Sequence, residues 1–146
     1  KRGLHCFGGE IKIDSAKLDN DFVFEKMEKP QWEIFQSFHD FEPAWENKKE
    51  AIKTCEALYS FYGVEKNGQL ISYAIVKNKD GNIAQFGVHP QFRNQGVGNF
   101  LFYHLSTLFP SVKSNNIDAS STLTLNFLEG VGLKNVVNQY EMAAHL

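Results

Sequence analysis

The sequence has little of what several classes of protein need. Cys6 and Cys55 are its only cysteines, too few and too isolated for a disulfide framework or a zinc site. No apolar run approaches the roughly 18 residues of a membrane-spanning helix, and no signal-peptide pattern opens the chain. The net charge of −2 indicates neither a nucleic-acid nor an anionic-membrane partner. We therefore expect a soluble, cytoplasmic protein without a metal site.

What is present predicts a packed domain. The 146 residues include 13 Phe, 5 Tyr and 2 Trp, an aromatic content that favours burial over disorder. No internal repeat or low-complexity linker divides the chain, so residues 1–146 are expected to form one domain. The chain begins at Lys1 rather than Met, which is compatible with a fragment of a longer protein.

One stretch is typical of a strand, a turn and the start of a helix. The apolar residues 83–88 can pair as a strand, which Pro90 ends because proline lacks the N–H that a ladder needs. Gly96 and Gly98 then lie in the first turn of a helix, where free N–H groups and the helix dipole attract anions. With Arg93 beside them, the turn is typical of a pyrophosphate site. The helix is predicted from a stripe of apolar residues at a spacing of about 3.6: Val97, Phe100, Leu101, Leu105 and Leu108.

Two common nucleotide-binding motifs do not fit this stretch. A phosphate loop of the ATPase kind needs Lys and then Ser or Thr after its glycines, and neither follows here. The dinucleotide fingerprint G-x-G-x-x-G would begin at Gly96, but its third glycine position is Leu101.

The remaining pattern predicts alternating strands and helices. Asn67-Gly68 is a strong hairpin signal between apolar strands over residues 60–65 and 70–76. The mixed order favours an α+β fold, with a largely antiparallel, twisted central sheet of about six or seven strands flanked by about four helices. Further strands are expected over residues 10–14, 22–24, 111–118, 136–137 and 139–142, and helices after Pro30, from Pro43 to about Ala57, and around Leu123, Phe127 and Leu128.

Three segments carry a resemblance to a known family. Residues 93–98, Arg-Asn-Gln-Gly-Val-Gly, follow a strand that ends in Val-His-Pro and resemble the acyl-CoA-binding motif of the GCN5-related N-acetyltransferase (GNAT) superfamily. Residues 126–133 are similar to the family's F-Y-x-x-x-G-F segment, and residues 139–142 to its final strand. The resemblance covers residues 22–143, which leaves residues 1–21 as a peripheral N-terminal segment.

The resemblance implies acetyl-CoA, or another acyl-CoA, as a bound acyl donor. Its pantetheine arm would pair with the backbone of Phe86 and Val88, and its pyrophosphate would lie on the amides of residues 94–99. Ser121 stands where the family usually has an Asn that bonds the cofactor, and Leu128 where it has a Tyr that protonates the leaving thiolate. The implied cofactor-binding residues are Phe86, Val88, Arg93, Asn94, Gln95, Gly96, Val97, Gly98, Asn99 and Ser121.

The catalytic groups are less well defined. Tyr140, on a late strand, is the best replacement for the missing tyrosine, with a packed core tyrosine as the alternative. The base that takes the proton of the attacking amine is not identifiable, because Gln85 and Gly87 are expected to face the cleft and neither can be a base. For two histidines a structural role is favoured over that of the base: His89 is expected at a surface turn and His104 in side-chain packing. Asp118 and Glu141 stay open as acidic candidates for the base.

Three functions stay open on this reading. The first is an enzyme that transfers the acetyl group of acetyl-CoA directly to a primary amine of a small-molecule or peptide acceptor, with no covalent enzyme intermediate. The second is a catalytically weak or inactive CoA-binding, regulatory module of a larger protein. The third is a structural domain whose glycines only make a tight turn.

Two further expectations concern partners. Residues 43–52 resemble part of the C-terminal half of bacterial family members that carry two such domains in tandem, so a second domain missing from this chain, or a homodimer, is expected. A set of aromatic residues could line an apolar acceptor pocket, although core packing is favoured for them: Trp32, Phe35, Phe38, Phe41 and Trp45.

Overall fold

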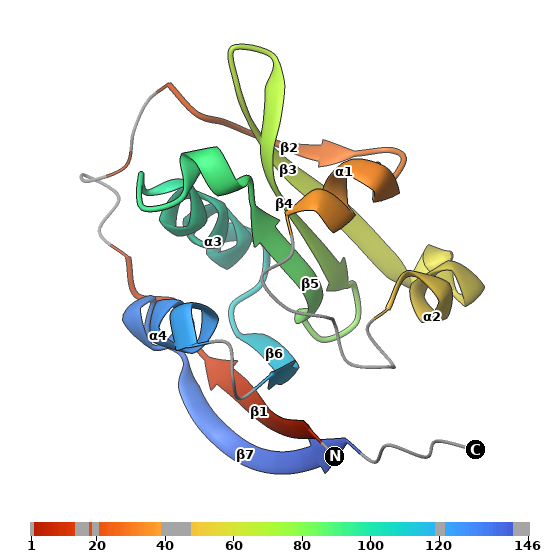
Figure 1. Cartoon of the computed structure of the whole chain (residues 1–146), viewed down its shortest axis with the longest axis vertical. Helices are drawn as coiled ribbons and strands as arrows, with labels where there is room; N and C mark the ends of the chain where they lie inside the picture. The colour runs from red at the N-terminus through yellow and green to blue at the C-terminus, as the bar shows by residue number, and fades with distance from the viewer. Residues whose placement is uncertain (1, 14–17, 19–20, 39–47, 119–121, 142–146) are drawn as a thin grey trace.

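The computed structural model describes residues 2–13, 18, 21–38, 48–118 and 122–141 (Figure 1). Within these ranges the chain forms seven strands, four α-helices and two short 3-10 turns. The strands are β1 (Arg2–Gly9), β2 (Val23–Met27), β3 (Tyr59–Lys66), β4 (Gln69–Lys77), β5 (Asn82–Val88), β6 (Val112–Asp118) and β7 (Lys134–Glu141). The helices are α1 (Trp32–Ser37), α2 (Lys49–Thr54), α3 (Val97–Leu108) and α4 (Thr122–Gly130), with 3-10 turns η3 (Glu56–Leu58) and η4 (Pro90–Phe92).

The strands form one mixed sheet in the order β2-β3-β4-β5-β6-β1-β7. Neighbouring strands run antiparallel except β5 and β6, which are parallel. Parallel strands need a long crossover connection, and α3 supplies it between β5 and β6. The predicted α+β fold with a largely antiparallel sheet is therefore confirmed.

The hairpin between β3 and β4 turns as its sequence predicts. Asn67 has a φ of 53° and Gly68 a φ of 79°, so both central residues are left-handed. This geometry matches the right-handed twist of the flanking strands, and Asn-Gly adopts it at little cost. The turn therefore fixes the register of the two strands in which most side chains are buried.

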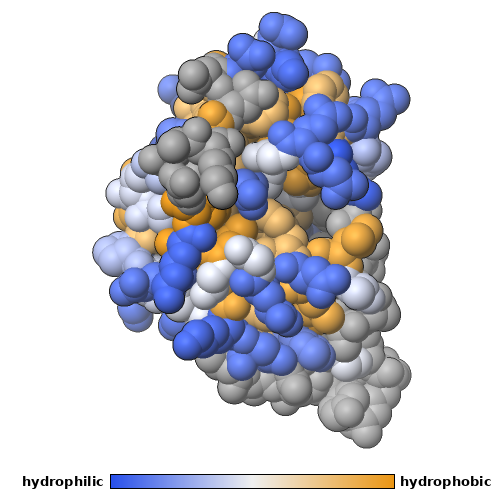
Figure 2. Space-filling view, turned by 90° about the vertical axis from the view of Figure 1, so that its left-hand side faces the viewer, coloured by the Kyte–Doolittle hydropathy of each residue, from blue (hydrophilic) through white to orange (hydrophobic). Residues whose placement is uncertain are grey.

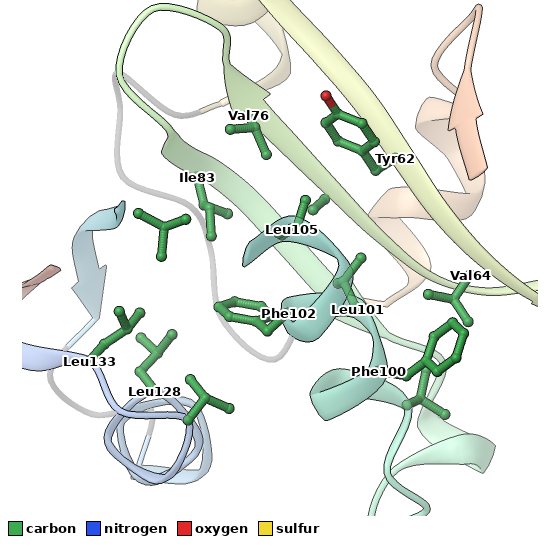
Figure 3. Packing of buried hydrophobic residues seen from close by; sticks show 14 of the residues in the cluster. Tyr62, Val64, Val76, Ile83, Phe100, Leu101, Phe102, Leu105, Leu128 and Leu133 are labelled. Carbon is green, nitrogen blue, oxygen red and sulfur yellow. The ribbon is translucent and has the colours of Figure 1, made fainter. Parts of the chain in front are cut away.

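Each face of the sheet packs on its own set of helices. On one face, α3 and α4 bury their apolar side chains against the sheet; Figure 3 shows Phe102 of α3 between Ile83 of β5 and the pair Leu128 and Leu133. On the opposite face, α1 and α2 cover the sheet through a second cluster, formed by Met27, Phe35, Phe38, Ile52, Phe61, Leu70, Tyr73, Ile75 and Ala84. Strand β5 therefore lies between two layers of helix.

The N-terminal segment corrects one prediction. Residues 10–13, the described part of the expected edge strand over residues 10–14, form no strand; instead β1 lies inside the sheet and pairs with both β6 and β7. The expectation that residues 1–21 are peripheral is therefore wrong for Arg2–Gly9. Ile11 and Ile13 pack against the core, and the Lys12 N–H donates to the Val131 carbonyl at 2.7 Å. Local alternation could not reveal a strand whose partners lie more than 100 residues away.

Other boundaries also differ. The two closing strands expected over residues 136–137 and 139–142 form one strand, β7. The described part of the predicted helix from Pro43 is the single helix α2 followed by η3, while residues 43–47 lie outside the described residues. Two residues assigned to inner helical faces point outward: Leu108 is 51% exposed and Leu123 is 71% exposed.

Candidate acyl-CoA site where two strands part

The two edges of β5 are paired very differently. Along one edge, β4 pairs with β5 from Lys77 and Asn82 through to Ser72 and Val88. Along the other edge, the register with β6 holds one pair, Asn82 with Lys113, and the Lys113 N–H donates to the Gly81 carbonyl at 3.1 Å. The two parallel strands therefore part beyond Asn82. We call the side of β5 that faces β6 its open edge.

The register shows which backbone groups face the open edge. Val88 lies opposite Ser72, and the next N–H, that of His89, donates to the Ile71 carbonyl at 2.8 Å. Val88 is therefore in a non-hydrogen-bonded pair, so its own N–H and C=O point away from β4. Because the pattern repeats every second residue, the same holds for Phe86. The two residues predicted to hold the pantetheine arm thus direct backbone donors and acceptors toward the place where the strands part.

The segment after β5 exposes more backbone donors. Residues 93–96, which we call the glycine turn, contain two left-handed residues, Asn94 with a φ of 63° and Gly96 with a φ of 82°. Gly96 is the N-cap of α3, no side chain caps the helix there, and its first turn contains no acidic residue. A Cβ built on Gly96 would meet no atom within 4 Å. The N-terminus of α3 is therefore uncapped, as an anion site at a helix end requires; anion binding itself stays a prediction.

Gly98 has a different role from Gly96. A Cβ built on Gly98 would lie 2.8 Å from Cε1 and 2.9 Å from Cζ of Phe127, in α4. The Phe127 ring also packs near Phe86, with ring centroids 5.9 Å apart, and near Phe102, at 5.0 Å. Gly98 therefore allows α4 to approach α3 next to the open edge of β5. This packing role of Gly98 could not be predicted from the sequence, because no local pattern indicates that Phe127 lies next to Gly98.

Arg93 connects the glycine turn to two other elements. Its Nε donates to the Val88 carbonyl at 3.1 Å, and its Nη2 donates to the Phe38 carbonyl at 3.0 Å. The sequence predicts only a charge beside the pyrophosphate. In the structure two of the guanidinium donors bind backbone carbonyls, one at the end of β5 and the other directly after α1.

The other face of β5 is closed by α1. Gln85 is buried, and its Oε1 accepts a hydrogen bond of 3.0 Å from the Tyr73 hydroxyl. A Cβ built on Gly87 would lie 3.0 Å from Cβ of Phe38 and 3.1 Å from Cε1 of Tyr73. The expectation that Gln85 and Gly87 face an open cleft is therefore wrong, because aromatic residues from α1 and β4 fill that space. Burial also raises the pKa of Tyr73 well above its ordinary value, which keeps the hydroxyl protonated as a donor.

His89 is held at the end of β5. Its Nδ1 accepts a hydrogen bond of 3.0 Å from the Gln91 N–H, and its half-buried ring packs near Phe38 and Phe92, with centroids 5.3 Å and 5.4 Å away. An imidazole that accepts at Nδ1 carries its proton on Nε2 when neutral. His89 therefore presents a donor rather than a free base at Nε2.

His104 packs within α3, as predicted. Its ring stacks on Phe24 with centroids 4.9 Å apart and lies 4.5 Å from the ring of Phe100. Burial lowers the pKa of His104, which favours the neutral imidazole. The ring is part of the packing between α3 and β2 and is not a candidate base.

The remaining predicted residues are scattered. Leu128 is fully buried in the core, so the position of the family's tyrosine contributes no hydroxyl. Tyr140 lies in β7 opposite Gly3, and β6 and β1 stand between β7 and β5 in the sheet. Asp118 ends β6 and Glu141 ends β7. Ser121, Phe41 and Trp45 lie outside the described residues.

The aromatic residues of α1 pack as a core. Trp32 contacts Phe35 and Phe61 edge-on, with ring centroids 5.8 Å and 6.1 Å away. Phe35 stacks on Tyr73 with centroids 4.0 Å apart. Of the two roles considered for them, the structure supports core packing for Trp32 and Phe35.

The fold defines an α+β protein in which two parallel strands part and the first of them leads, through the glycine turn, into a helix with no side-chain cap. The family follows from the sequence: the model of the acetyltransferase (GNAT) family matches residues 24–123, and the chain belongs to this family. The match includes β5, the glycine turn and α3. No curated protein matches the chain significantly.

Solved structures share the fold. A conserved protein of unknown function from Staphylococcus epidermidis has a TM-score of 0.66 at 17% identity, over 94% of this chain and 59% of that one. A Drosophila protein has a TM-score of 0.60 at 18% identity, over 94% of this chain and 49% of that one. The ribosomal-protein-S18-alanine N-acetyltransferase of Escherichia coli has a TM-score of 0.56 at 18% identity, over 80% of this chain and 79% of that one.

These likenesses concern the fold alone, because the identities are low. The chain spans about half the length of the Drosophila protein and 59% of the staphylococcal one. In the described ranges, no helix has the length and apolar character that crossing a membrane requires.

Proposed function

We propose that this domain binds acetyl-CoA, or another acyl-CoA, where β5 and β6 part, and transfers the acyl group to a primary amine of an acceptor. Family membership supports acyl transfer in general. The observation that carries the proposal for this chain is the single Asn82–Lys113 pair between β5 and β6, with the open N-terminus of α3 at the wide end. An extended ligand with an anionic end matches both features.

The proposed contacts divide the cofactor into two parts. The pantetheine arm carries amide groups, which would pair with the backbone groups that Phe86 and Val88 direct to the open edge: both N–H groups and the Phe86 C=O, since the Val88 C=O already accepts a hydrogen bond from Arg93. The pyrophosphate would accept hydrogen bonds from the amides of residues 94–99. Figure 2 shows hydrophobic residues gathered in the middle of the side on which α3 and α4 lie, bordered by hydrophilic ones. Such a surface suits the apolar stretches of the arm.

The proposed reaction is a direct attack. The lone pair of the amine nitrogen adds to the thioester carbon, the carbon–sulfur bond breaks, CoA leaves as the thiolate, and the nitrogen loses one proton to water to give the neutral amide. An alkyl thiol has a pKa of about 8.5, so release of the thiolate near pH 7 costs only about 2 kcal/mol relative to the thiol. A general acid is therefore not essential, although general acid catalysis typically contributes about 10²–10⁴-fold in rate.

We propose Tyr140 as that acid, although its backbone lies two strands farther from β5 than β6 does. Paired strands are about 4.8 Å apart, so β7 lies about 10 Å beyond β6, which itself parts from β5. Replacing Tyr140 with Phe removes the hydroxyl while it keeps the ring. If Tyr140 is the acid, kcat falls by at least about 10²-fold; an unchanged kcat assigns the ring a packing role.

A second function is supported by a specific observation. Leu128 fills the position of the family's tyrosine with a buried aliphatic side chain, and α1 closes the face of β5 on which a base was sought. A domain that retains the cofactor site and lacks turnover, and that regulates a larger protein, matches these features.

Binding and turnover should be measured separately. Isothermal titration with acetyl-CoA, CoA, ATP and NAD tests the site, and we expect heat only with the two CoA species. Release of free thiol from acetyl-CoA in the presence of an amine panel then tests transfer. Turnover with any amine excludes the non-catalytic module, whereas saturable binding without turnover supports it. No binding of either CoA species would contradict the proposed function.

A further inference from the structure

Arg93 connects elements from the two opposite faces of the sheet. It belongs to the glycine turn that leads into α3, on one face, and its Nη2 donates to the carbonyl of Phe38, the residue directly after α1 on the other face. Its Nε donates to Val88, whose backbone faces the open edge of β5. The Arg93 guanidinium therefore contacts both β5, the strand proposed to hold the pantetheine arm, and the end of α1. The backbone of Arg93 is part of the glycine turn, which is proposed to hold the pyrophosphate.

The Phe38 carbonyl is a suitable anchor. Phe38 is the C-cap of α1, where carbonyl groups lack partners inside the helix and carry the negative end of its dipole. A cation that donates to such a carbonyl is favourable, and the planar guanidinium can contact two carbonyls in a fixed geometry. A lysine in the same place has one compact charged group and cannot reproduce the planar fork.

The end of α1 is seated directly on β5. Cβ and the carbonyl oxygen of Phe38 lie 3.0 Å and 3.1 Å from a Cβ built on Gly87, and the Phe38 ring packs near His89. Any shift of Phe38 would therefore change the environment of the last residues of β5. The hydrogen bond from Arg93, in the glycine turn, to the Phe38 carbonyl holds Phe38 in this position on β5.

We propose that Arg93 is a positioning residue that couples acyl-CoA binding at the glycine turn to the seating of α1 on β5. The inference rests on the proposed function. A cofactor that orders residues 94–99 orders the backbone of Arg93 and thereby its guanidinium. The guanidinium then holds the Phe38 carbonyl, and the last turn of α1 with it. By linkage, firmer seating of α1 tightens cofactor binding by the same factor.

Hydrogen exchange of α1 tests the coupling. Amide exchange is followed in the peptide that covers residues 32–38, with and without saturating CoA, and CoA binding is measured separately by titration. In the wild type we expect CoA to slow exchange about fivefold or more, the lower end of typical coupling between sites. In Arg93→Met we expect faster exchange without CoA and no further slowing when CoA is bound.

Two further variants sharpen the test. Lys134→Met removes a positive charge from an exposed residue at the start of β7 and should behave as the wild type. Arg93→Lys keeps the positive charge but not the planar guanidinium, so CoA should slow amide exchange in residues 32–38 less than in the wild type. This variant also replaces Arg93→Met in the test if Arg93→Met does not fold. A purely structural role of Arg93 would speed exchange equally with and without CoA.

Each outcome decides the inference. Loss of the CoA-dependent slowing in the Arg93 variants alone supports it. Equal slowing in the wild type and in the Arg93 variants overturns it, as does a wild type that binds CoA without slower exchange in α1. If titration shows no CoA binding to the wild type, the proposed function fails and the inference with it.

Discussion

The two edges of β5 show what distinguishes scaffold from site in this molecule. Toward β4, β5 pairs along its whole length, from Asn82 to Val88. Toward β6, it pairs at Asn82 and then parts from its neighbour. The two edges carry the backbone groups of alternate residues of the same strand. Their neighbours are also connected differently: β4 leads into β5 through a tight turn, whereas β6 follows β5 only after the long crossover through α3.

The comparison extends to the two glycines at the start of α3. Gly96 faces open space, whereas Gly98 faces the ring of Phe127. The absence of a side chain at Gly96 leaves open space in front of the helix, whereas its absence at Gly98 leaves room for α4. The two glycines of this motif therefore have different surroundings, one open and one packed.

The largest expected effect is a loss of stability when the aromatic packing around Phe86, next to the open edge of β5, is removed. Phe102 is fully buried, and its ring lies 5.1 Å from that of Phe86 and 5.0 Å from that of Phe127. Phe102→Ala should lower the free energy of unfolding by about 3–5 kcal/mol. Leu108→Ala, on the same helix but 51% exposed, should cost no more than about 0.5 kcal/mol. Urea titrations measure both, and equal losses would contradict the packing described here.

A smaller effect is expected at Gly98. Gly98→Val forces a branched side chain against Phe127 and should destabilise the protein by about 2 kcal/mol through overpacking. Phe127→Leu in the same chain should recover part of that loss, which a double-mutant cycle measures. If Gly98 served ligand access instead, Gly98→Val would weaken CoA binding without a change in stability, and the cycle would show no coupling.

The smallest effect concerns His104, in the body of α3. Burial lowers its pKa from the ordinary 6.5, so below pH 6.5 the unfolded chain binds a proton that the folded protein does not. Stability should therefore fall as the pH falls from 6.5 toward the lowered pKa, and this part of the slope should vanish in His104→Gln. Thermal melts of both proteins between pH 7.5 and about pH 5 measure the difference. A larger slope in the variant would contradict the sign of the shift.

Local signals predicted the elements around the site. The Asn67-Gly68 turn, the strand that Pro90 ends and the apolar stripe of α3 all depend on nearby residues, and each is present. The position of the glycine turn between β5 and α3 followed from the same signals. These features are determined by backbone sterics and by the periodicity of neighbouring side chains.

Contacts between distant segments could not be predicted. The place of β1 between β6 and β7, the ring of Phe127 over Gly98, and the bond from Arg93 to the Phe38 carbonyl join residues far apart in the sequence. The closure of one face of β5 by α1 is of the same kind. The sequence pattern shows that α1 has an apolar side, but not which strand that side covers.

The central claim is that the N-terminus of α3 binds the anionic part of acyl-CoA, and thermal stabilisation by acetyl-CoA tests it most directly. Gly96→Asn and Gly96→Asp are a matched pair, since Asn and Asp both tolerate the left-handed φ of 82° but only Asp brings a negative charge. At 100 times its dissociation constant, acetyl-CoA should add about 2.7 kcal/mol of stability to the wild type. We predict that Gly96→Asn retains most of this stabilisation and that Gly96→Asp loses it. Equal stabilisation of Asn and Asp variants, or none in the wild type, would contradict the account.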